Sequence, residues 1–187
     1  MVVTAVNLQI VYLKSKLMQT LLQLLASLTD KLRTLVVQKN APTIAGNKLF
    51  EIAKSSLGQE LTPKDEVPDS VACMSTMNAL HKKAFGEPIG GDASTYLGYL
   101  ALRDSKKWVK VSSPLQGDVC ISPSGFNDAE GKKVVPNGHI GCYMGNNQIA
   151  SNSSTTGLFS MNYSLFDWRY RFVQLGHYPL WFFRKVL

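Results

Sequence analysis

The sequence predicts an α+β fold, because apolar residues follow a helical period in its first half and a strand-like period in its second half. Before Trp108, apolar residues recur at steps of three and four. From Trp108 onward the period is two, and turns such as Gly145-Asn146-Asn147 separate short apolar segments. With 187 residues, 45% of them hydrophobic, the chain can form one domain with a substantial core and an extension.

The extension is residues 1–39, where apolar side chains recur at helical spacing. These positions are Leu8, Val11, Leu17, Leu21, Leu24, Leu25, Leu28, Leu32 and Leu35. We expect a long amphipathic helix that forms a coiled coil, or that packs on a partner or a membrane surface through residues 7–37. A membrane span needs about 20 apolar residues, whereas the charge-free stretch from Leu17 to Thr29 has only 13.

Residues 40–46 contain a proline and a glycine and are interpreted as a linker to the main domain over 47–187. Three helices are expected at the start of this domain, over 47–57, from Asp69 to Gly86, and from Ser94 to about Arg103. In the third helix we expect a buried side made of Tyr96, Leu97, Leu100 and Ala101. The strands are expected at 108–111, 118–122, 139–144, 148–152, 170–175 and 180–186.

Cys73 lies near the start of the second expected helix, after Pro68 and the capping residue Asp69. The positive end of the helix dipole favours a thiolate over a thiol there, which is a recurring way to make a nucleophile. Positions 73, 77, 80 and 84 share one apolar face, so the alternative is an inert cysteine buried in the core.

A nucleophilic thiol needs a base, and the chain has three histidines. His81 lies about 12 Å along the same helix from the thiol, which is too far for contact, and His177 follows Gly176 in a late turn. His139 opens an expected strand, and the following hairpin turn places Ser151 and Asn152 roughly across from it. An asparagine can orient an imidazole by accepting its N–H. The alternatives are a surface histidine at a strand end and an ordinary turn asparagine.

The net charge of +7 suggests an anionic partner, which could be nucleic acid, anionic lipid or an anionic cell-wall polymer. Lysines and arginines are scattered and no nucleic-acid-binding motif is visible, so nucleic acid is disfavoured. The three cysteines at 73, 120 and 142 match neither a disulfide framework nor the usual spacing of metal ligands.

Three elements together resemble the papain-like NlpC/P60 and CHAP families of cell-wall hydrolases. They are the helix-start Cys73, the segment Gly117-Asp118-Val119, and Gly138-His139-Ile140-Gly141 followed by Tyr143 and Gly145. The resemblance covers residues 47–187 and implies a papain-like fold, with N-terminal helices packed on a central antiparallel sheet. It implies Cys73 as the nucleophile, His139 as the base and Asn152, or Ser151, as the third polar residue. Asp118 is interpreted as structural.

By this resemblance the chain is expected to be a cysteine peptidase or amidase that cleaves an amide bond of the stem peptide or cross-bridge of peptidoglycan. No cofactor and no metal are implied. The alternatives are an inactive wall-binding or virion-structural module and an acyltransferase with the same Cys–His pair. The expected location is secreted and cell-wall-directed or phage-associated, although the start Met1-Val2-Val3 lacks the basic residues of a signal peptide.

Overall fold

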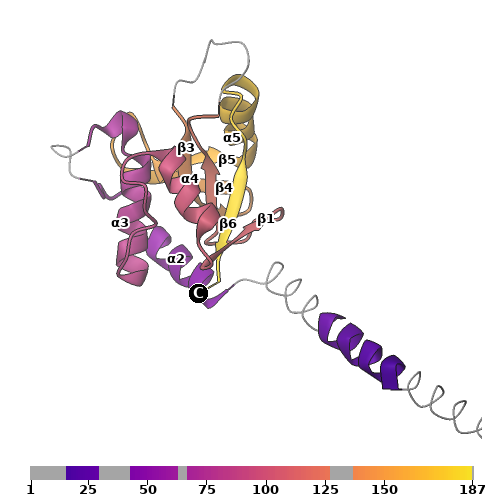
Figure 1. Ribbon diagram of the computed structural model, residues 1–187. Helices are drawn as coiled ribbons and strands as arrows, with labels where there is room; N and C mark the ends of the chain where they lie inside the picture. The colour runs from indigo at the N-terminus through magenta and orange to yellow at the C-terminus, as the bar shows by residue number, and fades with distance from the viewer. Residues whose placement is uncertain (1–15, 30–42, 63–66, 127–136, 187) are drawn as a thin grey trace, which may run out of the picture. The chain divides into compact units, whose positions relative to one another are not determined.

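The computed structural model describes residues 16–29, 43–62, 67–126 and 137–186. The chain divides into two compact units, Met1–Asn40 and Ala41–Leu187. Figure 1 labels most helices and strands of the second unit.

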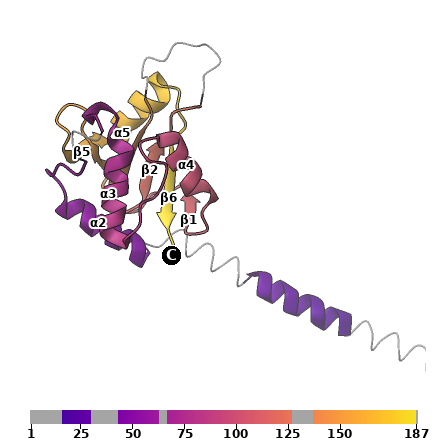
Figure 2. The same ribbon diagram turned by 60° about the vertical axis from the view of Figure 1, so that its left-hand side comes forward.

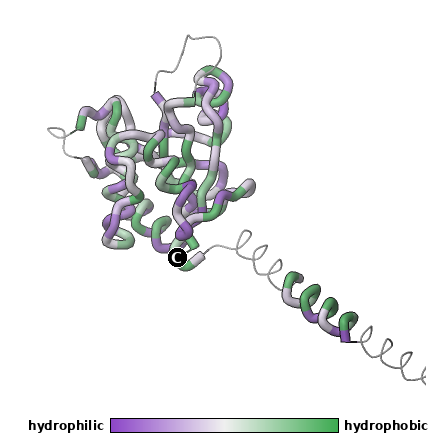
Figure 3. Tube along the Cα trace, in the orientation of Figure 1, coloured by the Kyte–Doolittle hydropathy of each residue, from purple (hydrophilic) through white to green (hydrophobic). Residues whose placement is uncertain are grey.

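In the first unit, residues 16–29 form a helix whose side chains are all exposed. Its exposed apolar residues are Leu17, Met18, Leu21, Leu22, Leu24, Leu25 and Leu28, and Figure 3 shows them as green stretches of the tube. The rest of the helix expected over residues 1–39 lies outside the described residues, so its full length and its coiled-coil or membrane-surface role stay predictions. Within the described part of the chain, no helix combines the length and apolar character needed to cross a membrane.

The second unit is α+β, as expected, and its described strands form one six-stranded antiparallel sheet in the order β1-β6-β2-β3-β4-β5. The strands are β1 (Trp108–Val111), β2 (Val119–Ser122), β3 (His139–Gly145), β4 (Gln148–Asn152), β5 (Phe159–Ser164) and β6 (Trp181–Lys185). The β3–β4 turn has positive φ at Gly145, Asn146 and Asn147, which is the backbone that glycine and asparagine tolerate best.

The helices are α2 (Ile44–Ser55), α3 (Cys73–Phe85), α4 (Thr95–Asp104) and α5 (Leu165–Trp168), with a short 3₁₀-helix η1 (Asp69–Val71) and a π-helix η2 (Arg169–Leu175). Residues of α2, α3 and α4 share one hydrophobic core with one face of the sheet. Figure 2 shows α3 and α4 in front of β2 and β6. Trp168 and Phe172, from α5 and η2, pack in a second core with residues of the opposite face.

The alternation of side chains along the strands separates these two cores. On β2, Val119 and Ile121 face the helices α2–α4, whereas Cys120 faces the second core. On β3, Cys142 faces the helices and Tyr143 faces the second core. Neighbouring residues of a strand therefore belong to different environments, and this decides which side chains can meet at the site.

The strand expected over 170–175 is wrong, because these residues belong to the π-helix η2. Trp168 and Phe172 are the buried members of α5 and η2, whereas Tyr170, which a strand would bury on the same face, is 51% exposed. The signal for the helix start is Ser164 and Asp167, which form a capping box. Strand β5, just before this cap, was not expected from the sequence.

Helix boundaries also differ from expectation near the linker. The helix α2 begins at Ile44, inside the segment interpreted as a linker, because the Thr43 hydroxyl accepts a hydrogen bond from the Gly46 N–H and caps the helix. Residue Asp69 begins η1 instead of capping α3, whose N-cap is Ala72, so Cys73 is the first residue of α3. The expected stop of α3 at Gly86 is confirmed, with φ of 79°.

The buried side expected for the third helix is wrong. In α4, the buried residues are Thr95, Gly98 and Leu102, whereas Tyr96 and Leu97 are 39% and 50% exposed. The reason is a close approach between helices: a Cβ on Gly98 would lie 2.4 Å from the sulfur of Met74. A glycine thus marks the contact face of α4, and an apolar stripe does not.

Asp118 has the structural role expected for it. Its carboxylate accepts hydrogen bonds from Nε and a terminal nitrogen of Arg184 at 2.9 and 2.8 Å, and from the Leu115 N–H at 2.7 Å. Both charged side chains are 1% exposed, so this buried pair ties the start of β2 to the end of β6.

Candidate active site

A cavity of about 190 Å³ lies beside the start of α3 and the start of β3. Cys73, His139 and Asn152, the three residues singled out in the sequence, all line it. A smaller hollow of about 70 Å³ also has Cys73 in its lining and shares Ser70, Asn137 and Gly138 with the cavity. The space beside the thiol therefore extends beyond a single cavity, as a chain-like substrate requires.

The thiol of Cys73 lies at the start of a long helix and is almost fully buried, with 6% of the residue exposed. Burial raises its pKa to about 11, while the backbone N–H groups of Ile140, Met74 and Cys73 itself lower it by a smaller amount. The resting state of this cysteine at neutral pH is therefore the thiol, in contrast to the thiolate that the helix position alone suggested.

The imidazole of His139 is held on two sides. Its Nε2 lies 2.9 Å from the Ser151 hydroxyl, and its ring stacks on Phe172 at a centroid distance of 5.2 Å and an interplanar angle of 11°. Trp168 and Tyr163 contact the ring at 5.2 and 5.5 Å. Burial, and to a smaller extent the charge of Arg171, lowers the pKa of His139 to about 3, so the ring is neutral and available as a base.

Ser151 is itself fixed by a neighbour on β5. The Asn162 side-chain amide donates hydrogen bonds to the Ser151 carbonyl at 2.8 Å and to its hydroxyl at 3.2 Å. The hydroxyl keeps a second lone pair, which can accept the Nε2–H of His139. In that arrangement the other ring nitrogen, Nδ1, carries no proton and can act as a base.

Asn152 makes its hydrogen bonds elsewhere. Its amide nitrogen donates to the Asp69 carbonyl at 2.8 Å, and its oxygen accepts from the Thr76 hydroxyl at 3.3 Å. Strand alternation explains the difference, since adjacent residues of β4 point to opposite faces of the sheet. Ser151 shares the face of His139, whereas Asn152 faces α3. Ser151, the alternative that the sequence left open, is the residue in contact with the imidazole.

Residues of β5 and η2 complete the cavity and were missed in the sequence. Tyr163, Arg171 and Phe172 line it, but the segment that carries two of them was expected to be a strand. The available signal was the capping box at Ser164, which marks the start of α5 and therefore of the helical turn that follows.

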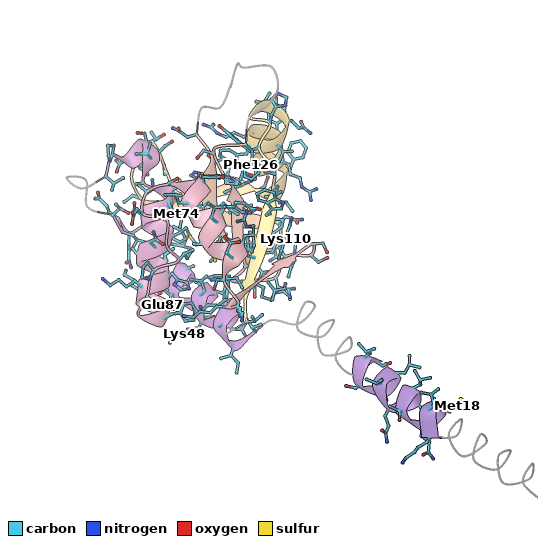
Figure 4. All side chains as sticks on the ribbon, viewed as in Figure 1. Met18, Lys48, Met74, Glu87, Lys110 and Phe126 are labelled. Atoms are coloured by element: carbon cyan, nitrogen blue, oxygen red, sulfur yellow. The ribbon has the colours of Figure 1, made fainter. Side chains whose placement is uncertain are left out.

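The remaining cysteines and His81 lie in other places. Cys120 and Cys142 are fully buried in the two cores, where burial raises the pKa of both thiols. His81 lies towards the other end of α3, where its Nδ1 donates to the Glu87 carbonyl at 2.6 Å. Figure 4 labels Met74, in the first turn of α3, and Glu87, two residues after its end. Across the described residues, no group of three or more His, Cys, Asp and Glu side chains could hold a metal ion.

The start of α3 also supplies hydrogen-bond donors. The first hydrogen bond of the helix runs from the Thr76 N–H to the Ala72 carbonyl at 2.8 Å. The N–H groups of Cys73, Met74 and Ser75 precede it and have no acceptor within the helix. N–H groups at a helix start stabilise negative charge that develops on a nearby oxygen, and those of Cys73 and Met74 already interact with the thiol of Cys73.

Comparisons with known proteins give structural neighbours and no sequence match. No family model and no curated protein matches the chain. Among solved structures, it is similar to NlpC2 from Trichomonas vaginalis, with a TM-score of 0.43 and 18% identity over 79% of this chain and 48% of that one. NlpC1 from the same organism gives a TM-score of 0.43 and 19% identity over 79% and 46%. The chain thus spans about half the length of these two neighbours.

Proposed function

We propose that this protein is a cysteine amide hydrolase in which Cys73 is the nucleophile, His139 is the base and Ser151 orients the imidazole. The observation that supports the proposal most directly is the shared cavity. It combines a thiol at a helix start, with backbone N–H groups directed at it, and a neutral imidazole whose Nε2 is held by a hydroxyl.

The reaction begins from an uncharged pair, because burial keeps both the thiol and the imidazole neutral. As the sulfur of Cys73 attacks the amide carbonyl, Nδ1 of His139 takes the thiol proton. The backbone N–H groups at the start of α3 stabilise the oxyanion of the tetrahedral intermediate. The imidazolium then protonates the leaving amine, the C–N bond breaks and a thioester remains on Cys73. Water, activated by His139, hydrolyses the thioester and releases the carboxylate product.

The proposed substrate is the peptide part of peptidoglycan, cut in the stem peptide or in the cross-bridge. Two adjoining hollows share Cys73 in their linings, which gives room for an extended peptide. The net charge of +7 favours attachment to an anionic polymer such as a bacterial cell wall. The resemblance in the sequence around Cys73 and His139 points to the same substrate. The protein would then act as a secreted or phage-associated wall hydrolase.

Digestion of purified peptidoglycan by the whole protein tests this function. The wild type is expected to release fragments whose masses reveal one new amine and one new carboxylate per cut. Cys73→Ala is expected to release none. Cys120→Ala, which also removes a buried thiol but one outside the cavity, is the matched control and should retain turnover. Full activity of Cys73→Ala would contradict the mechanism, and the fragment masses identify the bond that is cut.

A further inference from the structure

Arg171 is a cation at the cavity that the proposed chemistry does not use. It is an exposed residue of η2 that lines the same cavity as Cys73 and His139. Its guanidinium carbon lies 5.8 Å from the centroid of Phe172, the ring on which His139 stacks. The positive charge of Arg171 adds to the burial that lowers the pKa of His139, and it opposes the burial that raises the pKa of Tyr163. The guanidinium therefore belongs to the imidazole side of the cavity.

The structure leaves this guanidinium without a carboxylate partner among the described residues. The ion pairs formed there join Arg103 to Asp104, Lys107 and Lys185 to Glu87, and Arg184 to Asp118. Of the residues that the structure describes, Asp69 is the one acidic member of the cavity lining, and its carboxylate packs against Gly157, where a Cβ would lie 2.5 Å from Oδ1. A planar, unpaired guanidinium beside a cavity is suited to bind a carboxylate through two hydrogen bonds.

The chemistry of the proposed reaction decides which half of the substrate faces Arg171. His139 must deliver a proton to the leaving nitrogen, so this nitrogen has to come within hydrogen-bonding distance of the imidazole. The half of the substrate that carries the leaving amine therefore lies on the imidazole side, with Arg171. The acyl half extends from Cys73 towards the smaller hollow, whose lining includes the hydroxyl residues Ser94, Thr95 and Ser124 and contains no charged side chain among the described residues.

We propose that Arg171 binds a carboxylate on the half of the substrate that leaves as the amine, and so makes the enzyme selective for bonds with a free carboxylate near the leaving nitrogen. This inference rests on the proposed function. It predicts a substrate whose amine product is an amino acid, or a short peptide, with a negative charge close to the new amine. The acyl half needs no charge for recognition.

Purified peptidoglycan in two forms tests the proposal, one untreated and one with its free carboxyl groups converted to amides by a carbodiimide and ammonia. The wild type is expected to release amine groups from the untreated form about tenfold faster or more, the usual effect of a charge-assisted hydrogen bond. Arg171→Gln is expected to lose this preference and to digest both forms at the slower rate, whereas Arg171→Lys should recover part of the preference.

Arg169→Gln is the matched control, because it removes the same charge from an exposed position of η2 that does not line the cavity. It should keep the wild-type preference, which separates a local contact from a general effect of net charge. An Arg171→Gln protein that retains the full preference overturns the inference, as does a wild type that digests both forms equally fast. Both results leave the proposed function standing. A wild type that digests neither form overturns the proposed function itself, and the inference with it.

Discussion

Two histidines of this protein occupy similar surroundings. His139 lies among Phe172, Trp168 and Tyr163, and His81 lies between Phe85 and Trp108, at centroid distances of 4.6 and 5.5 Å. Each has one ring nitrogen in a hydrogen bond, to a serine hydroxyl or to a backbone carbonyl. Burial lowers the pKa of both.

The difference is what lies next to each ring. His139 shares a cavity with a thiol at a helix start, whereas His81 has Glu87, Lys107 and Lys185 around it and no cysteine. A hydrogen bond to a carbonyl fixes the Nδ1–H tautomer of His81, whereas the Ser151 hydroxyl can accept from or donate to His139. Burial and a shifted pKa therefore do not by themselves identify a catalytic histidine. The proposed role of His139 rests on the neighbouring thiol and on its freedom to exchange a proton.

Replacing each histidine separates the two roles most strongly. His139→Ala is expected to lower the rate of peptidoglycan digestion by about a thousandfold, because general base catalysis contributes about a hundred- to ten-thousandfold. His81→Gln is expected to keep the rate within about twofold at a temperature where it is folded. Initial rates of amine release measure the activity of each variant. Equal losses of rate in the two variants would contradict a catalytic role for His139 alone.

Replacing Ser151, the proposed orienting residue, is expected to lower the rate less than replacing His139. Ser151→Ala removes the contact to Nε2 and is expected to lower kcat by about ten- to a hundredfold, since it acts through His139 and leaves the reacting atoms in place. Asn152→Ala is expected to change kcat less and to destabilise the fold by about 1–3 kcal/mol, because it removes buried hydrogen bonds between β4 and the start of α3. Steady-state kinetics and urea unfolding of both variants check this, and the opposite pattern would return the orienting role to Asn152.

His81 is expected to matter for stability instead. His81→Gln should reduce the free energy of unfolding by about 1–3 kcal/mol, because it disturbs a buried ring and its hydrogen bond to the Glu87 carbonyl. Urea unfolding followed by circular dichroism measures the loss. An unchanged urea concentration at the unfolding midpoint would show that the His81 side chain does not stabilise the C-terminal end of α3.

The smallest expected effect is that of pH on the rate. Because the pKa of His139 is lowered to about 3, its neutral form persists well below its ordinary pKa of 6.5. The kcat/KM at pH 5 should therefore stay within about twofold of its value at pH 7, whereas an ordinary histidine base would lose about thirtyfold. A fall with a midpoint near 6.5 would show that the imidazole is solvated in the working enzyme.

The stability of the fold, unlike kcat/KM, is expected to fall as the pH is lowered over the same range. Both His81 and His139 have lowered pKa values in the folded protein, so the unfolded chain binds protons first as the pH falls below about 6.5. The contribution of these neutral rings to stability is complete above that pH and is lost progressively towards pH 3. Circular dichroism at each pH separates unfolding from a true loss of rate.

The sequence predicted the part of the site that local signals mark. Cys73 and His139 each stand beside a helix or strand boundary defined by proline, glycine or alternation, and both line one cavity in the structure. The choice between Ser151 and Asn152 depends on strand register, because Gly141 pairs with Ser151 and lies two residues from His139 on the same face. The turn alone predicts the wrong residue, because continuing its Gly145–Gln148 pairing along the strands would pair Gly141 with Asn152. A register shift between Tyr143 and Gly145 moves the pairing by one residue and brings Ser151 to the face of His139.

Other features depend on tertiary packing and carry no local signal. The period-two pattern of Tyr170 and Phe172 resembles a strand, but one buried ring per helical turn is enough for η2 to pack on the second core. Likewise Gly98 defines the contact face of α4 only because Met74 lies opposite. The pKa shifts of Cys73 and His139 come from burial by distant segments, which helix position alone could not reveal.

Gly138 has a consequence for how this protein could be altered. A Cβ there would lie 2.2 Å from the Ser124 nitrogen, and Ser124 in turn receives and makes hydrogen bonds with the Thr95 hydroxyl. The backbone before His139 thus lies directly against Ser124, and Ser124 is tied to the first residue of α4. A larger residue at position 138 would have to displace this backbone, and the imidazole one residue further on would move with it.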